Sequence, residues 1–360
     1  MPENKIDLYS TRAMQEYVAQ EPGIARFIRE TFFKGADVYD TDTIDVDIVS
    51  KGRPIACMVR RYEDGNLVED SDFETRSVKT GYMNEFKVIE IGKFMKRKVN
   101  ETPYAYTSPG VQAQQAQREA LKELVDRQNR AEEVMAVQAL TEGTFTGRNK
   151  EGVKLYEADF RMKPEHKPVL APDLMWDNPK GIKKNIVMKM FRDWITDYLQ
   201  KNGGKMPTHG ILGRNAFNAF LNLVDPDDQN SGIDSFRVYR GDVTPRMQEM
   251  GVFFLGTFPE LANIQIIGYN EWYDDPYDGG KTKPIFPANK AVLCSTQAKY
   301  RRQYGRVDHL DAPDFIERFA YTWRTPNGKK EQAQIESAPL LVVFEPDTIV
   351  SATVTMGEAA

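Results

Sequence analysis

The side chains best able to do chemistry in this chain are three closely spaced aspartates. Asp274, Asp275 and Asp278 offer carboxylate oxygens, the ligands that hard cations such as calcium prefer. Their spacing lacks the pattern of a calcium-binding loop, and Pro276 interrupts the run. We therefore expect a solvated acidic turn. A soluble α/β metal-dependent enzyme that combines these aspartates with His309 is the rival hypothesis.

A glycine pair follows the aspartates directly. Gly279-Gly280-Lys281-Thr282 has the residues of a phosphate-binding loop, in which backbone N–H groups cradle phosphates. A Walker loop needs an earlier glycine where this chain has Asp275, and a helix after the lysine, where Pro284 and Pro287 break the chain. The sequence therefore favours a turn.

The three histidines do not suggest a metal site. His166, His209 and His309 show no metal-ligand spacing, and neither Cys57 nor Cys294 lies near one of them in sequence. The motifs Gly-x-Ser-x-Gly and Gly-x-Gly-x-x-Gly do not occur. We therefore expect no catalytic residue, no cofactor, no metal and no enzymatic activity.

Two pairs of glutamates complete the candidates. Glu132-Glu133, and Glu85 with Glu90, are close only along the chain. On a helix and a strand, respectively, we expect them on solvated faces or in salt bridges between subunits.

The composition indicates a sizeable core and no global attraction to nucleic acid. Of 360 residues, 41% are hydrophobic and the formal net charge is -5, whereas strong duplex binding usually requires a basic face. Two cysteines exclude a disulfide framework. No apolar run reaches the roughly 20 residues of a membrane helix, and the N-terminus does not resemble a signal peptide. We expect a soluble protein made in a reducing compartment.

The N-terminal third combines two short helices with strands. Ser10 can cap a helix over 11–20, and Pro22 can open a second helix that ends at Lys34-Gly35. Residues 39–48 alternate as in a half-buried strand. Residues 55–62 and 86–94 are strand-like around a polar middle at 63–80, which indicates a projecting hairpin. Charges on this hairpin are candidate inter-subunit contacts, although a solvated loop is an equal alternative: Arg60, Arg61, Glu69, Asp70, Lys93 and Arg97.

The clearest helix begins after Ser108. Pro109 suits its first turn, one narrow apolar stripe runs to about Thr141, and Gly143 ends it. A helix of this length with one apolar side is a strut or a coiled-coil partner.

The remaining chain predicts a mixed α/β unit after a hairpin and a proline-rich connection. We expect the hairpin over 145–162 and an amphipathic helix over 187–198. Further elements are a helix over 215–224 and strands over 209–212, 252–255, 264–268, 291–295 and 340–344.

This order of parts resembles the major capsid proteins of lambda-like tailed phages. The resemblance rests on framework residues along nearly the whole chain and is weakest over 50–105 and 226–250. The matching segments are Arg26-Phe27-Ile28-Arg29-Glu30, Glu132-Glu133 with Met135 and Gly143, Phe286-Pro287, Val292-Leu293, Thr296-Gln297-Ala298, Tyr304-Gly305, Ser337-Ala338-Pro339-Leu340 and Pro346-Asp347.

The resemblance implies the α+β Hong Kong 97 capsid fold, divided into four parts. These are an N-terminal arm (1–40), an extended loop region (41–105), a peripheral domain (106–175 and 298–340) with a spine helix over 109–142, and an axial domain (176–297 and 341–360).

The resemblance also implies partners. Pentamers and hexamers of such proteins close into an icosahedral shell around double-stranded DNA, by way of a procapsid that expands, with a portal, in the host cytoplasm. No helical segment precedes the arm, so we expect a separate scaffold protein. Lys79 and Lys87 could form isopeptide cross-links, but no partner Asn is identified, which favours a decoration protein. An encapsulin-type compartment of the same fold is the alternative.

Overall fold

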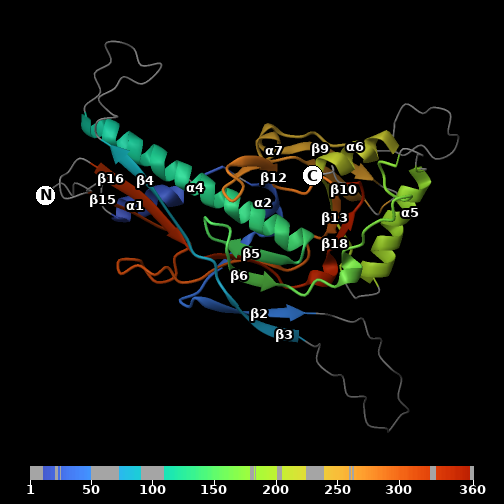
Figure 1. Ribbon diagram of the computed structural model, residues 1–360, viewed down its shortest axis with the longest axis horizontal. Helices are drawn as coiled ribbons and strands as arrows, with labels where there is room; N and C mark the ends of the chain where they lie inside the picture. Colours follow the sequence, from blue (N-terminus) through green and yellow to red (C-terminus); the bar gives the residue numbers. More distant parts are fainter. Residues whose placement is uncertain are drawn as a thin grey trace, which may run out of the picture.

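The protein is an elongated α+β body with one long helix, α4 (Pro109–Thr141), along it (Figure 1). The computed structural model describes residues 11–20, 23–24, 26–49, 73–90, 109–178, 182, 184–200, 205–223, 239–258, 261, 263–324 and 330–356. None of the helices within these ranges combines the length and apolar character needed to cross a bilayer.

One end of the body is a six-stranded sheet flanked by helices (Figure 1). Its strand order is β18-β13-β7-β10-β9-β8, in which β7 and β10 are parallel and the other pairs antiparallel. Phe191, Phe217, Phe220 and Trp176 fill the core between sheet and helices. The bounds are β18 Val350–Thr353, β13 Lys290–Cys294, β7 His209–Leu212, β10 Ile264–Tyr269, β9 Val252–Phe258, β8 Tyr239–Arg240, α5 Lys184–Trp194 with a π-helical continuation Ile195–Gln200, α6 Arg214–Leu223 and α7 Pro245–Glu249. The predicted mixed α/β unit is confirmed.

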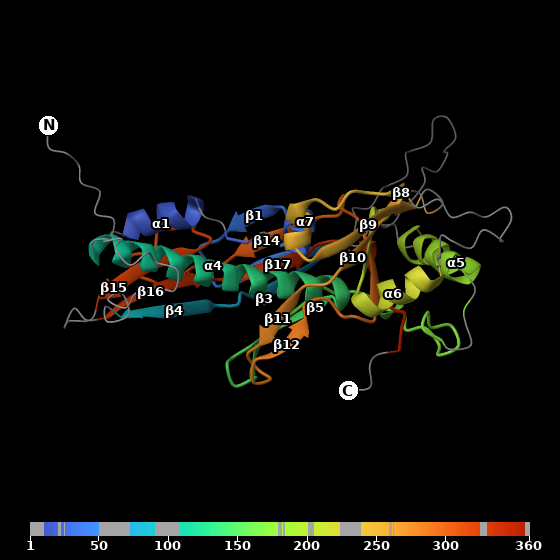
Figure 2. The same cartoon turned by 90° about the horizontal axis from the view of Figure 1, so that it is seen from above.

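The other end is a three-stranded antiparallel sheet, β15-β16-β4, covered on one face by helices (Figure 2). Helix α1 and the first half of α4 pack on it through Met14, Leu121, Leu124, Ala333 and Ile335. The bounds are β15 Phe319–Arg324, β16 Lys330–Ser337, β4 Met83–Glu90 and α1 Thr11–Gln20. The predicted helix over 11–20 is confirmed.

Between the two ends, a small sheet and three ribbons form the middle of the body. The small sheet, β1-β14-β17, shares the largest core with the second half of α4. The bounds are α2 Phe27–Phe32, β1 Gly35–Val38, β14 Tyr300–Tyr304, β17 Pro339–Val343, and the ribbons β2 Thr43–Val49 with β3 Phe73–Lys79, β5 Thr144–Arg148 with β6 Lys154–Asp159, and β11 Trp272–Asp275 with β12 Lys281–Pro284; short 3-10 turns span Pro164–His166 and Pro346–Thr348. The hairpin predicted over 145–162 is confirmed.

Helix α4 ends where the sequence indicates. Gly143 has φ 68°, and a Cβ there would lie 2.3 Å from Cβ of Met162, so only glycine fits this left-handed position. Lys290 Nζ donates to the carbonyl of Thr141 (3.4 Å) and Lys167 Nζ to that of Glu142 (3.2 Å). These cations satisfy carbonyls at the negative end of the helix dipole.

The residues expected to form a projecting hairpin are arranged differently where they are described. The polar middle expected over 63–80 contains strand β3, which pairs with β2. Only Val78 of β3 is buried, so this strand is set by its partner and not by its own pattern. The strand expected over 86–94 begins at Met83 and pairs with β16. Lys330 of β16, the partner of Glu90, lies 240 residues further along the chain. The strand expected over 55–62 lies outside the described residues.

Candidate functional site

The six residues predicted as inter-subunit contacts fall outside the described part of the chain. They are Arg60, Arg61, Glu69, Asp70, Lys93 and Arg97.

The three aspartates near position 275 lie on the β11–β12 hairpin. Asp274 accepts from the hydroxyl of Thr282 (2.8 Å), and the other two pair with lysines. Asp275 pairs with Lys283 (2.8 Å), and Asp278 pairs with Lys281 and Lys283 (both 3.2 Å). The glycine pair forms the turn, with φ 62° and 78°, which confirms the turn prediction. Among the described residues, no group of three His, Cys, Asp or Glu side chains is placed to hold a metal ion.

The histidines lie in three separate environments. His166 is buried, and its Nδ1 donates to the carbonyl of Ile349 (2.8 Å). His309 packs against Tyr321, with ring centroids 4.4 Å apart and the ring planes tilted by 44°. His209 lies edge-on to Phe32, and burial together with Lys34 lowers its pKa.

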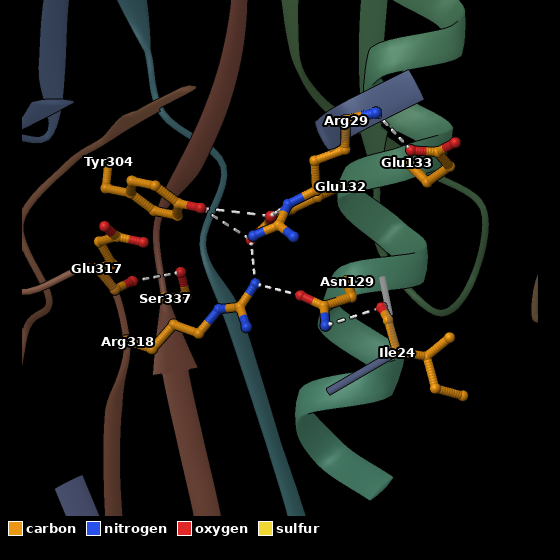
Figure 3. A network of polar contacts seen from close by, with 9 residues as sticks. All are labelled: Ile24, Arg29, Asn129, Glu132, Glu133, Tyr304, Glu317, Arg318 and Ser337. Atoms are coloured by element: carbon orange, nitrogen blue, oxygen red, sulfur yellow. Dashed lines mark hydrogen bonds and ion pairs between the residues drawn. The ribbon is translucent and has the colours of Figure 1, made fainter. Parts of the chain in front are cut away.

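The most organised polar site is a buried cluster on α4 (Figure 3). Glu132 is fully buried. Its carboxylate meets Nε of Arg29 at 2.5 Å and Nη2 of Arg318 at 2.8 Å, and the hydroxyl of Tyr304 donates to both oxygens at 3.3 Å. Arg318 also donates to Oδ1 of Asn129 at 2.7 Å. One carboxylate thus joins α2, α4, β14 and the start of β15.

The neighbouring glutamate caps a helix that has no cap of its own. Helix α2 begins after Arg26, whose side chain makes no capping bond. Instead, Glu133 accepts the backbone N–H groups of Ile28 (2.9 Å) and Arg29 (2.8 Å), and the hydroxyl of Tyr269 (2.8 Å). These N–H groups are among those that a helix start leaves unpaired. Helix α4 therefore supplies the N-cap of helix α2.

The two carboxylates differ in electrostatics although both are buried. Burial opposes ionisation of Glu132, but Arg318, Arg29 and Arg302 outweigh it and lower its pKa. Burial raises the pKa of Glu133, and the hydrogen bonds from Ile28, Arg29 and Tyr269 only partly offset it. Glu132 is thus held as a charged partner of arginines, whereas Glu133 acts chiefly as a hydrogen-bond acceptor.

The expectation that Glu132 and Glu133 face solvent or another subunit is wrong. Both are fully buried within one chain. The position of the two glutamates on the helix indicates this burial. Glu132 lies one turn before Ala136, and Glu133 lies one turn before Val137 and two turns before Leu140; these three apolar residues are buried. Glu85, by contrast, pairs with Arg127 through two bonds of 2.9 and 3.0 Å within the chain.

Protonation of Glu132 should lower the stability of the folded chain, whereas protonation of Glu133 should raise it. The stability that Glu132 contributes is present above the ordinary pKa of 4.5 and is lost as pH falls through its lowered pKa. The stability that Glu133 contributes is present below 4.5 and is lost as pH rises through its raised pKa. Relative to the wild type, we expect Glu133→Gln to gain stability as pH rises above 4.5, and Glu132→Gln to gain it as pH falls below 4.5.

Urea unfolding of the wild type and both variants between about pH 3 and pH 8 measures this difference. A parallel pH dependence for the two variants would contradict it.

The geometry of the cluster indicates a structural role. It contains no nucleophile paired with a base and no described metal-ligand group, and each carboxylate is occupied by donors of its own chain. Its effect is to lock α2 and three strands to α4.

Comparisons with known proteins give one consistent result. Residues 10–354 match the family described as Phage major capsid protein E. The chain is 23% identical over 362 residues to the major capsid protein of Enterobacteria phage P21, covering 95% of this chain and 98% of that relative. It is 21% identical over 329 residues to the major capsid protein of Escherichia phage lambda, covering 89% and 91%.

A solved structure shares the fold. The putative capsid protein of an Escherichia coli prophage superposes with a TM-score of 0.69 at 17% identity, covering 96% of this chain and 99% of that one. The expected capsid fold is therefore confirmed.

Proposed function

The chain belongs to the phage major capsid protein E family, and from this premise we propose that its copies form the pentamers and hexamers of an icosahedral head that encloses double-stranded DNA. A major capsid protein of a phage head is a structural protein of the virion. The match over residues 10–354 carries this proposal. The net charge of -5 supports enclosure of DNA without specific binding.

The proposal includes the assembly route. Subunits would assemble in the host cytoplasm with a separate scaffold protein and a portal, first as a procapsid that then expands. We also propose a decoration protein in place of covalent cross-links, because the chain belongs with lambda-like capsid proteins and no partner Asn is identified for Lys79 or Lys87.

We further propose the four-part division of the chain. Helices α1 and α2 support an arm over 1–40, and α4 with the β15-β16-β4 sheet supports a peripheral domain over 106–175 and 298–340. The six-stranded sheet supports an axial domain over 176–297 and 341–360. The ribbon β2–β3 would be the base of the extended loop region over 41–105.

Electron microscopy and sedimentation of the chain expressed with its scaffold protein test the function. We expect closed shells. Monomers alone at every concentration and salt tested would contradict the proposal. Genes for a terminase and a portal beside this gene would separate a phage head from an encapsulin-type compartment, which lacks both.

A further inference from the structure

A cavity of about 670 Å³ lies between helix α6 and residues 176–178 and 355–356, near the C-terminal end of the described chain (Figure 2). Its size is within the roughly 300–1,000 Å³ of pockets that hold small ligands. Ile182, Ala219 and Leu223 give it an apolar part, but most of the other lining residues are polar. Cavities that stay empty are apolar, so this lining indicates a polar occupant.

Two buried polar groups of the residues that line this cavity have no hydrogen-bond partner. Trp176 is 3% exposed and Thr355 is 1% exposed, and within the described chain nothing bonds Nε1 of Trp176 or Oγ1 of Thr355. Phe191 and Phe220 hold the indole ring in place, with centroids 5.7 and 5.8 Å from it. Because a buried donor without an acceptor costs free energy, an occupant that accepts from the indole N–H would be stabilised here.

Three asparagines add a row of amides along one side of the cavity. Asn215, Asn218 and Asn222 are three and four residues apart on α6, which places them on one face of the helix. All three line the cavity, and their side chains make no hydrogen bond to another described residue. Each carboxamide can both donate and accept. The row therefore suits a ligand whose own groups do both.

The charge of the lining favours a neutral ligand. Among the described residues around the cavity, Asp177 alone is charged. Its two carboxylate oxygens already accept the backbone N–H of Met356, at 3.1 and 2.9 Å. This carboxylate would repel an anion such as phosphate, and one carboxylate is fewer than a divalent cation usually binds.

We propose that the cavity between α6 and residues 355–356 is a binding site for a neutral saccharide. Sugar hydroxyls donate and accept, so one carboxamide can bond two neighbouring hydroxyls. An extended peptide is the rival ligand, but it presents backbone groups to one side only every second residue, about 6.6 Å apart. The asparagines follow one another at about 4.5 and 6 Å along the helix axis. The site lies within one chain, so its occupancy does not depend on the assembly of shells.

The first test follows the indole N–H of Trp176 by NMR of the full-length subunit. The chain has four tryptophans, and Trp176→Phe identifies the signal. The probes are maltose, cellobiose, trehalose and N,N′-diacetylchitobiose. We expect at least one of them to shift the Trp176 signal saturably and to leave that of Trp323, on the distant β15, unchanged. The absence of a shift with all four sugars would overturn the proposal, as would a shift with inorganic phosphate or acetyl-trialanine amide alone.

The second test removes two amides of the row in the double variant Asn218→Ala/Asn222→Ala. Both side chains are exposed, so we expect an unchanged melting temperature and a Kd for the responding sugar at least about tenfold higher. The matched control Leu221→Ala shortens an exposed side chain of the same helix that does not line the cavity, and it should bind as the wild type does. Unchanged affinity of the asparagine variant, or an equal loss in the control, would overturn the proposal.

Discussion

Replacing Glu132 with alanine should destabilise the folded chain by about 3–5 kcal/mol, the usual cost of removing one partner of a buried ion pair. The carboxylate is fully buried between Arg29 and Arg318. Its loss leaves two guanidinium groups close together without a counter-charge, and it also removes the acceptor for the Tyr304 hydroxyl. The free energy of unfolding, from denaturant titration of the subunit, measures the effect.

The same helix provides a matched control. Glu123 is also a glutamate of α4 that pairs with a cation, Lys87, but it is 53% exposed. Glu123→Ala should change stability by about 0–1 kcal/mol, as for other surface ion pairs. The double variant Glu132→Ala/Arg318→Ala should cost less than the sum of its parts, because the second change removes a charge that the first left unpaired. Equal costs at positions 123 and 132 would show that the cluster is not structural.

Leu124→Asp, at the middle of α4 and about two turns before Glu132, should have an effect of similar size. Leu124 is 3% exposed and lies in the core that joins α4 to α1 and the β15-β16-β4 sheet. A carboxylate there has no partner and would cost several kcal/mol, on the order of 3–5. We expect loss of cooperative unfolding and absence of shells.

Two controls separate charge from volume. Lys122→Asp places the same side chain at an exposed position of the same helix and should leave the subunit stable. Leu124→Ala should cost about 2–5 kcal/mol through a cavity alone. Normal shells from Leu124→Asp would mean that this face of α4 is not buried.

The sequence predicted those elements whose own pattern determines them. The sequence predicts the apolar stripe of α4 from its spacing, and both ends of the helix because Pro109 and Gly143 mark its boundaries. The alternation of Ile44, Val46 and Ile48 gave β2, although the strand begins at Thr43 and not at residue 39. The second helix was expected from Pro22, but α2 starts at Phe27, because its cap comes from Glu133.

Other features could not be predicted because they depend on partners distant in sequence. Strand β3 exists through β2, and β4 through β16. The burial of Glu132 and Glu133 requires arginines and tyrosines from four other parts of the chain: Arg29, Tyr269, Tyr304 and Arg318. Their position on the helix places both glutamates on the apolar side, but glutamates generally favour solvent, and the partners that reverse this preference become apparent only in the tertiary structure.

The remote cap of α2 has a consequence for the order of events during synthesis. The acceptor for Ile28 is 105 residues further along the chain. At about 5–20 residues per second, a ribosome exposes Glu133 roughly 5–20 seconds after Ile28 has emerged. Until then α2 lacks the group that fixes its first turn. Nascent chains therefore pass through a period in which residues 27–32 are present without the hydrogen bonds that hold the start of α2 in the folded chain.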